Sequence, residues 1–217
     1  MGELIRLAER RQARRARPRR RSESLRAEFL FDLACPFTYL VSERIDRAFD
    51  DVTWTPASTT TLRGGSLASD EGALSGVREA AEERAATLRL PLEWPESWPN
   101  EVPAAMRVAS HAAECGKGAA FVLAAGRLAF CGGFDLDDPE ILAEAAGAAG
   151  LALDDCLQAA GDRGRDGAIE AAGRRLLVVG ADRLPALRIG RAMYWGESQV
   201  ADATAAARLH AAAACRS

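Results

Sequence analysis

The chain has 217 residues, of which 48% are hydrophobic and 27% are charged, and its formal net charge is −3. No apolar run approaches the ~18 residues that a membrane-spanning helix requires, so we predict a globular protein without a span. The five cysteines show no regular spacing, which argues against a secreted domain held by disulfides, and a reducing cytoplasm is the predicted compartment.

Residues 1–27 form a basic block with ten arginines and three glutamates, a net charge of +7, whereas the rest of the chain carries −10. The block has no apolar core of the kind found in secretory signals, and it has no aromatic residues for stacking on bases. Specific nucleic-acid binding is therefore not predicted. Two interpretations stay open, a basic arm for an anionic partner and a leader that docks on the acidic body of its own chain. We expect the block to be dispensable for folding, whereas a large loss of melting temperature on its deletion would indicate that it docks on the body.

The stretch from residue 28 to residue 49 contains the most informative local pattern. Apolar side chains on both faces of residues 28–34 predict a central strand, and Pro36 with apolar residues at helical spacing behind it predicts a helix. Cys35 would then face unpaired N–H groups and the positive end of the helix dipole. That position predicts a thiol with a lowered pKa, with the Thr38 hydroxyl as a further source of stabilisation. A buried structural cysteine is the alternative.

The next segments alternate between regular and irregular structure. Residues 52–57 predict a second strand, parallel to the first because a helix connects them. Residues 59–65 predict a loop and residues 77–88 a helix. Four prolines and two tryptophans between positions 91 and 103 then exclude a regular helix, and we expect a packed irregular connection there.

For the rest of the chain the sequence predicts a helical region followed by a hairpin. Helices are predicted at residues 104–115, 119–130, 139–147, 153–160 and 166–175. Residues 176–180 either close the last of these helices or form a short strand. Residues 184–189 and 192–195 predict two strands joined by a turn at Gly190, with a final helix from about Ser198.

This order of elements, with Cys35-Pro36 after the first strand and Pro185 before the third, resembles the α/β thioredoxin fold with an inserted helical domain of the DsbA-like family. The motifs are most similar to the branch of 2-hydroxychromene-2-carboxylate isomerases and kappa-class glutathione transferases. The matching segments are FDLACPFTYL (31–40), LPL (90–92), FDLDDPEIL (134–142), GL (150–151), LPA (184–186) and YWG (194–196). The resemblance implies an arm (1–27), a thioredoxin domain in two parts (28–60 and 178–217) and a helical insertion (61–177).

The resemblance also implies roles for individual residues. Cys35, followed by Pro36, takes the place of the branch's serine and of the nucleophilic cysteine of disulfide oxidoreductases. Pro185 takes the place of a cis-proline that faces the nucleophile, so that the backbone of Leu184 can pair with a thiol peptide. The expected ligand contacts continue along Trp195, Gly196, Glu197 and Ser198. The last three of these lie where the family holds a γ-glutamyl carboxylate at a helix N-terminus.

Departures from the family pattern bear on the expected chemistry. Ser198-Gln199 replaces an Asp-Arg pair, so the acid expected to hold the amino group of glutathione is missing. Arg183-Leu184-Pro185 replaces Gly-Val-Pro and makes the approach to the site bulkier and more charged. Thr38 stands where a dithiol enzyme has its second cysteine, so an efficient oxidase is not expected. Cys131, in a glycine-rich stretch, is the candidate for a distant resolving thiol.

Together these residues predict a thiol–disulfide oxidoreductase or thioltransferase in which Cys35, with Pro36 and Thr38 beside it, is the single nucleophile. Two alternatives stay open, a glutathione-dependent isomerase or transferase and a non-catalytic thioredoxin-fold binding protein. We expect no tightly bound cofactor, glutathione or another low-molecular-weight thiol as the partner, and we leave a homodimer open. His111 and Cys115 share a predicted helix face, but no second pair at ligand spacing accompanies them, so no metal site is predicted.

Overall fold

The computed structural model describes residues 26–214, so the expectations for the basic block of residues 1–27 lie almost entirely outside the described residues. The strands are β1 (Ala27–Phe31), β2 (Val52–Pro56), β3 (Ala186–Ile189) and β4 (Ala192–Trp195). The helices are α2 (Pro36–Ala48), α3 (Thr59–Arg63), α4 (Glu71–Leu88), α5 (Pro103–Glu114), α6 (Gly118–Phe130), α7 (Pro139–Ala148), α8 (Leu153–Gly161), α9 (Asp166–Val178) and α10 (Glu197–Ala214), with the short 3-10 turns η1 (Leu67–Ser69) and η2 (Arg163–Arg165).

The strands form one mixed sheet in the order β2-β1-β3-β4. β1 pairs in parallel with β2 and antiparallel with β3, so that Phe29 lies between Trp54 and Leu187. Phe29 and Phe31 are fully buried, because helices cover both faces of this central strand. The β3–β4 hairpin turns at Gly190, whose positive φ of 59° favours glycine. This topology confirms the thioredoxin-type fold.

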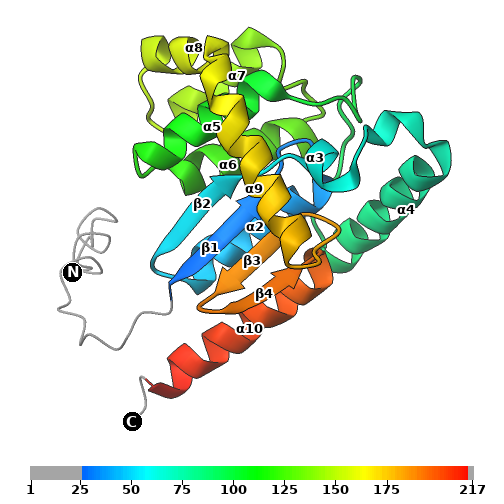
Figure 1. Ribbon diagram of the computed structural model, residues 1–217, viewed down its shortest axis with the longest axis vertical. Coiled ribbons are helices and arrows are strands. Elements are labelled where there is room, and N and C mark those ends of the chain that lie inside the picture. Colours follow the sequence, from blue (N-terminus) through cyan, green and yellow to red (C-terminus); the bar gives the residue numbers. More distant parts are fainter. Residues whose placement is uncertain (1–25, 215–217) are drawn as a thin grey trace, which may run out of the picture.

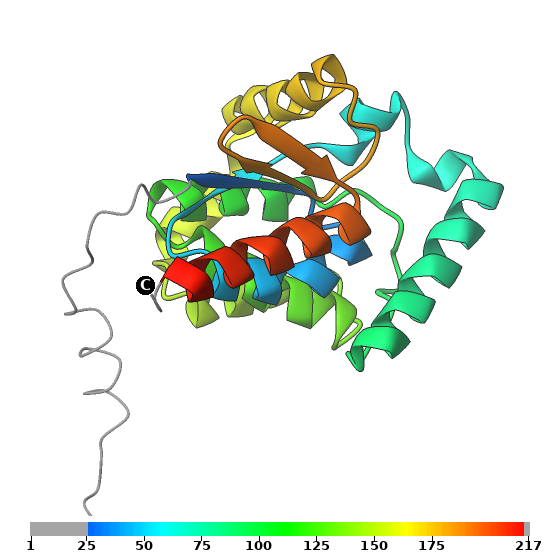
Figure 2. The same ribbon diagram turned by 90° about the horizontal axis from the view of Figure 1, so that it is seen from below.

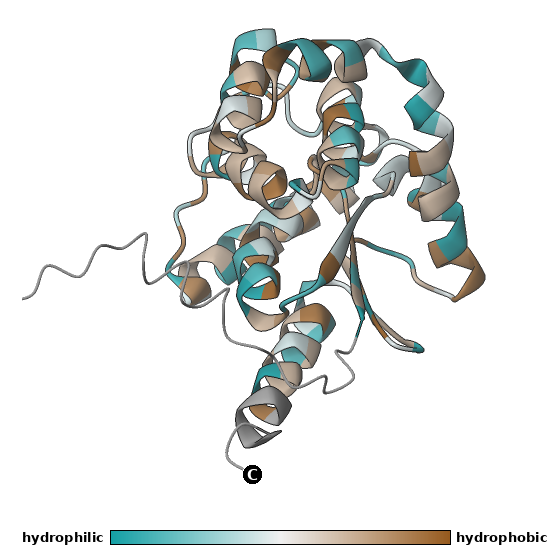
Figure 3. Ribbon diagram, turned by 90° about the vertical axis from the view of Figure 1, so that its left-hand side faces the viewer, coloured by the Kyte–Doolittle hydropathy of each residue, from teal (hydrophilic) through white to brown (hydrophobic). Residues whose placement is uncertain are grey.

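Helices cover the two faces of the sheet unequally. α2 and α10 pack side by side below the sheet in Figure 2, and α9 lies above it. The lower layer buries Val41, Ile45 and Val200, whereas the upper layer buries Ala172 and Leu176 against the sheet. Helices α5–α8 stack beyond the end of the sheet (Figure 1). Hydrophobic and hydrophilic positions alternate along most helices, as expected where one helix face is buried (Figure 3).

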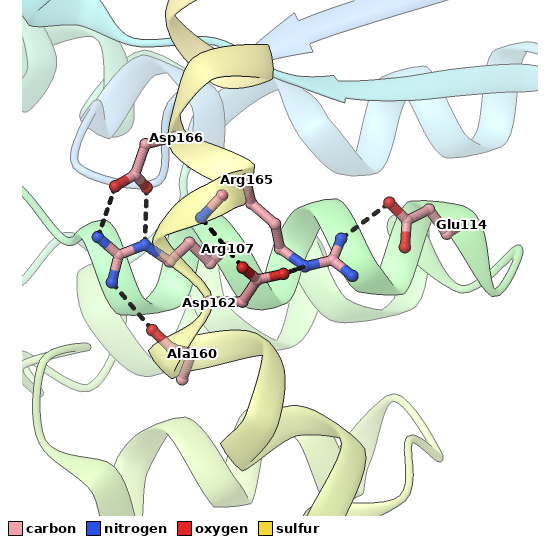
Figure 4. A network of polar contacts seen from close by, with 7 residues as sticks. Arg107, Glu114, Ala160, Asp162, Arg165 and Asp166 are labelled. Atoms are coloured by element: carbon pink, nitrogen blue, oxygen red, sulfur yellow. Dashed lines mark hydrogen bonds and ion pairs between the residues drawn. The ribbon is translucent and has the colours of Figure 1, made fainter.

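A polar network joins α5 to the junction between α8 and α9 (Figure 4). Arg107 donates to both carboxylate oxygens of Asp166, at 2.6 and 2.8 Å, and to the carbonyl oxygen of Ala160 at 3.0 Å. Arg165 reaches back to Glu114 at 2.8 Å. The hydrogen bond from Arg107 lowers the pKa of the Asp166 carboxyl group, so the network favours the ionised acid.

Some boundaries differ from the sequence-based expectations, and one open alternative is resolved. The expected loop at residues 59–65 contains the helix α3, which the Ser58 side chain caps and Gly64 ends in a left-handed conformation. α4 begins at Glu71, six residues earlier than expected, because the Asp70 side chain accepts a hydrogen bond from the N–H of Ala73. Residues 176–178 belong to helix α9, which resolves the alternative left open. β1 ends at Phe31, since residues 32–35 form a turn.

Helix α4 stands apart from the rest of the molecule in both ribbon views (Figures 1 and 2). The residues buried on it are two alanines, Ala81 and Ala85. The partly buried side chains of Leu74 and Val77 also pack against the core. Polar and cation–π contacts add to this attachment and are described with the site below. None of the helices within residues 26–214 is long and apolar enough to cross a membrane.

Candidate active site

Cys35 occupies the N-cap position of α2, and Pro36 is the first residue of that helix. Its sulfur lies 3.7 Å from the carbonyl oxygen of Leu184. The Leu184–Pro185 peptide bond is cis, as the resemblance implied. The structure thus brings together two segments that lie far apart in the sequence.

A cavity of about 850 Å³ opens between this junction, α3, α4 and the proline and tryptophan segment. Its volume is in the range of small-molecule sites. Most of the residues predicted from the sequence line it, namely Cys35, Pro36, Leu184, Trp195, Gly196, Glu197 and Ser198. Thr38 and Pro185 are buried and do not line the cavity.

The electrostatic expectation for Cys35 is wrong for this structure. The residue is half-buried and borders the cavity, and desolvation by the surrounding protein raises the pKa of the Cys35 thiol to about 12. The negative charge of Asp32 raises the pKa further. The N–H groups of Thr38 and Phe37 and the Thr38 hydroxyl lower it, as the helix start predicted, but desolvation outweighs them.

Asp32 is a buried acid at the floor of the cavity, with 8% of its surface exposed. One carboxylate oxygen accepts a hydrogen bond from the N–H of Ala34 at 2.9 Å, and the other accepts one from the N–H of Thr59 at 2.8 Å. Burial raises the pKa of Asp32, and these hydrogen bonds offset only part of the effect. Asp32 therefore links the Cys35 turn to α3 and places a second titratable group beside the thiol.

Two hydroxyl groups near the Cys35 thiol and the Asp32 carboxyl group have no hydrogen-bond partner among the described residues. They belong to Thr38 and Thr59, and both hydroxyl oxygens are buried. Each nonetheless lowers the pKa of its neighbour, Thr38 that of Cys35 and Thr59 that of Asp32. Donors of this kind favour negative charge on the sulfur or on the carboxylate.

Arg84 and Glu197 close one side of the cavity. Arg84 on α4 donates to both carboxylate oxygens of Glu197, at 2.7 and 2.9 Å, and Arg44 lies 3.7 Å from the same carboxylate. Glu197 is the first residue of α10, where a negative charge suits the helix dipole. The region expected to hold a ligand carboxylate is thus engaged in an internal ion pair.

The proline and tryptophan segment is irregular and packed, as expected, and it also contributes to the site. The indole N–H of Trp98 donates to the carbonyl oxygen of Ala34 at 2.9 Å. The Trp94 ring lies 4.3 Å from that of Trp98, and the Arg78 guanidinium of α4 lies 4.8 and 5.0 Å from the two ring centres. The Arg78 contacts hold α4 against the proline and tryptophan segment. The Trp98 hydrogen bond holds that segment against the turn that carries Ala34 and Cys35.

Other candidate groups lie elsewhere. His111 and Cys115 do approach each other, with 3.6 Å between ring nitrogen and sulfur. Within residues 26–214 no group of three or more His, Cys, Asp or Glu side chains is arranged to hold a metal ion. Cys131 is exposed and does not line the cavity, so the structure does not bring the candidate resolving thiol to Cys35.

Sequence reasoning missed several lining residues. Asp32 stands in the quoted motif but received no role, although a lone acid beside a cysteine at a helix start is a usable signal. Arg63 and Arg84 lie on helices whose relation to the site depends on tertiary structure, so no local signal identifies them. The sequence favours a packed connection for the segment that contains Trp98, so it does not single out this residue for the site.

Comparison with known proteins agrees with this architecture. The family model described as "DSBA-like thioredoxin domain" matches residues 27–207, so the chain belongs to the DSBA-like thioredoxin family. No curated protein matches the sequence.

Solved structures show the same fold at low sequence identity. A 2-hydroxychromene-2-carboxylate isomerase has a TM-score of 0.72 at 16% identity, covering 88% of this chain and 99% of its own. The cytosolic disulfide reductase DsbM from Pseudomonas aeruginosa, solved with GSH, has a TM-score of 0.67 at 16% identity, with 89% and 100% coverage. A probable DsbA oxidoreductase from Streptomyces coelicolor has a TM-score of 0.63 at 23% identity, with 84% and 88% coverage.

Proposed function

We propose that this member of the DSBA-like thioredoxin family is a thiol–disulfide oxidoreductase that uses Cys35 as a single nucleophile and acts on a small disulfide. The observation that carries the proposal is the position of Cys35, at the start of α2, on the cavity and 3.7 Å from the Leu184 carbonyl oxygen. A low-molecular-weight thiol in a reducing cytoplasm is the proposed partner.

The proposed step is one exchange reaction. The Cys35 sulfur attacks one sulfur of the disulfide, the S–S bond breaks, and a Cys35 mixed disulfide forms. The other half leaves as a thiolate and takes up a proton equivalent to the one that Cys35 lost. A second thiol then attacks the mixed disulfide and restores Cys35.

The raised pKa of Cys35 bears on the direction of exchange. A low pKa stabilises the reduced form of an active-site cysteine, as its thiolate. The disulfide that this cysteine forms is then a strong oxidant. The Cys35 thiol, with a pKa of about 12, lacks this stabilisation. The environment therefore favours a reductase or transferase over an oxidase, in keeping with the Thr38 that replaces the second cysteine.

The test is intact-mass and peptide-level analysis after incubation with small disulfides. One adduct on Cys35 is expected, and Cys35→Ser should abolish it. Adducts confined to the exposed Cys115 and Cys131 would refute the proposal and favour a binding protein without catalysis.

A glutathione-dependent isomerase or transferase is the second candidate, favoured by the size of the cavity, which leaves room for a substrate beside a thiol. It requires the thiol to bind without forming a disulfide. Calorimetric titration with reduced glutathione distinguishes it, because this candidate needs binding to the Cys35→Ser variant as well.

A further inference from the structure

The charges around Cys35 indicate what kind of disulfide the cavity can accept. Eight charged residues line it. The acidic ones are Asp32, Glu83, Glu101, Asp182 and Glu197, and the basic ones are Arg63, Arg84 and Arg183.

Two of the three arginines are neutralised by carboxylates of the protein itself. Arg84 donates to both oxygens of Glu197, at 2.7 and 2.9 Å. Arg183 does the same with Asp182, at 2.8 and 2.7 Å. Because each bidentate pair uses two donors of the guanidinium fork, neither arginine is set to receive a carboxylate of a ligand.

The remaining charges are mostly negative. Arg63 forms no ion pair with any residue in the part of the chain that the structure describes, and the same is true of Asp32, Glu83 and Glu101. Even if buried Asp32 is set aside as an acid with a raised pKa, two carboxylates oppose one guanidinium. A carboxylate brought next to Cys35 therefore meets unpaired lining charges that are mostly of its own sign. Arg44, which lies 3.7 Å from Glu197, does not line the cavity.

We propose that the disulfide accepted by Cys35 carries no carboxylate near its sulfur atoms, so that the cognate low-molecular-weight thiol is uncharged or cationic around its sulfur. This inference rests on the proposed function and deepens it. Glutathione disulfide, which carries carboxylates on both halves, becomes a poor partner for this chain. Each carboxylate placed in the cavity should slow the reaction by roughly fivefold or more.

The test compares three small disulfides that differ mainly in charge: cystamine, bis(2-hydroxyethyl) disulfide and dithiodiglycolate, which are cationic, neutral and anionic. The rate of adduct formation on Cys35 in the full chain is measured by peptide-level mass spectrometry. Each rate is divided by the rate for Cys35 in the urea-unfolded chain, which removes the intrinsic reactivity of the disulfide. The normalised rate for the anionic compound should be at least about fivefold below that of the neutral one, with the cationic compound equal to the neutral one or faster. The gap should narrow near 1 M salt, where the screening length is about 3 Å.

Charge variants assign the effect to the cavity. Glu83→Gln and Glu101→Gln should each raise the ratio of the anionic to the neutral rate, and Arg63→Gln should lower it. Glu79→Gln is the matched control, because Glu79 lies one turn before Glu83 on α4 and does not line the cavity. It should leave the ratio unchanged.

The two levels of the proposal fail in different ways. If Cys35 reacts and dithiodiglycolate is as fast as the neutral compound or faster, the inference is overturned while the thiol-exchange function stands. If none of the three compounds modifies Cys35, the proposed function falls and this inference falls with it.

Discussion

The indole nitrogen of Trp98 donates a hydrogen bond to the carbonyl oxygen of Ala34 at 2.9 Å. The backbone N–H of Ala34 donates to a carboxylate oxygen of Asp32, also at 2.9 Å. Both backbone groups of the residue that precedes Cys35 are thus held by side chains, one of them from the helical insertion. The geometry around the Cys35 thiol therefore depends on the insertion as well as on the thioredoxin unit.

Trp98→Phe tests this dependence. The substitution keeps a buried ring but leaves the Ala34 carbonyl oxygen without its donor, which should lower the free energy of unfolding by about 1–3 kcal/mol. Hydrogen exchange in residues 32–38 should become faster.

The matched control is Trp94→Phe. The Trp94 indole N–H donates to Glu82, an exposed residue of α4, at 2.9 Å. Loss of this hydrogen bond should lower the free energy of unfolding, measured in urea, by less than Trp98→Phe does. It should leave hydrogen exchange at residues 32–38 unchanged. Equal effects of the two variants on that exchange would contradict a special role for Trp98.

Asp32→Asn should make Cys35 more reactive. The Asp32 carboxylate raises the pKa of the Cys35 thiol, so removing its charge should lower that pKa and increase the thiolate fraction at any pH below it. Alkylation of Cys35 with iodoacetamide at pH 8 should be severalfold to tenfold faster. Asp46→Asn, on the exposed side of α2, serves as the control. Slower alkylation of Asp32→Asn would instead make Asp32 the group that accepts the thiol proton.

Much of the fold could be predicted because its signals are local. The apolar run of β1, Pro36 at the start of α2 and the turn at Gly190 each depend on neighbouring residues alone. α3 and the first turns of α4 escaped prediction because single capping residues, Ser58 and Asp70, start them inside small, polar sequence. Capping side chains carry weak sequence signals when no apolar periodicity accompanies them.

The site could be predicted in position but not in electrostatics. Motif resemblance placed Cys35 near Leu184, 149 positions away. The helix start correctly predicted groups that lower the thiol pKa, but the opposing desolvation depends on how distant segments close around the sulfur. The pairing of Arg84 with Glu197, 113 positions apart, is tertiary in the same sense.

Arg84→Gln should loosen α4. The Arg84 side chain is 30% exposed and that of Glu197 only 7%, so the substitution leaves a largely buried carboxylate with Arg44 alone near it. Loss of one partner of such a pair should cost about 2–3 kcal/mol, and protease cleavage within residues 66–90 should become faster.

The exposed pair of Arg47 with Glu43 provides the comparison. The Arg47 side chain is 69% exposed, so Arg47→Gln should change the free energy of unfolding by less than about 0.5 kcal/mol. If Arg84→Gln lowers the free energy of unfolding as little as Arg47→Gln does, the ion pair of Arg84 with Glu197 does not hold α4.

Asp166→Asn should destabilise the protein at neutral pH but not in acid. The hydrogen bond from Arg107 depresses the folded-state pKa of Asp166, so the stabilisation is present above the unfolded pKa of about 3.9 and is lost as the pH falls through the folded value. The Asp166 side chain is 36% exposed, and screening by solvent should keep the effect below about 1 kcal/mol. The melting temperatures of the two proteins should differ at pH 7 and converge near pH 3. A constant difference would attribute the effect to packing.

Thr38→Cys should shorten the life of a mixed disulfide on Cys35. Thr38 follows Cys35 by one helical turn, and its buried hydroxyl has no hydrogen-bond partner within residues 26–214. A thiol at that position should attack the Cys35 sulfur, release the small thiol and leave an internal disulfide. Thr38→Ser, which keeps the hydroxyl, should retain the adduct as long as the native chain does. Intact mass followed over time after removal of excess disulfide measures both lifetimes. An adduct that lasts equally long in Thr38→Cys would mean that the α2 turn cannot bring position 38 to the Cys35 sulfur.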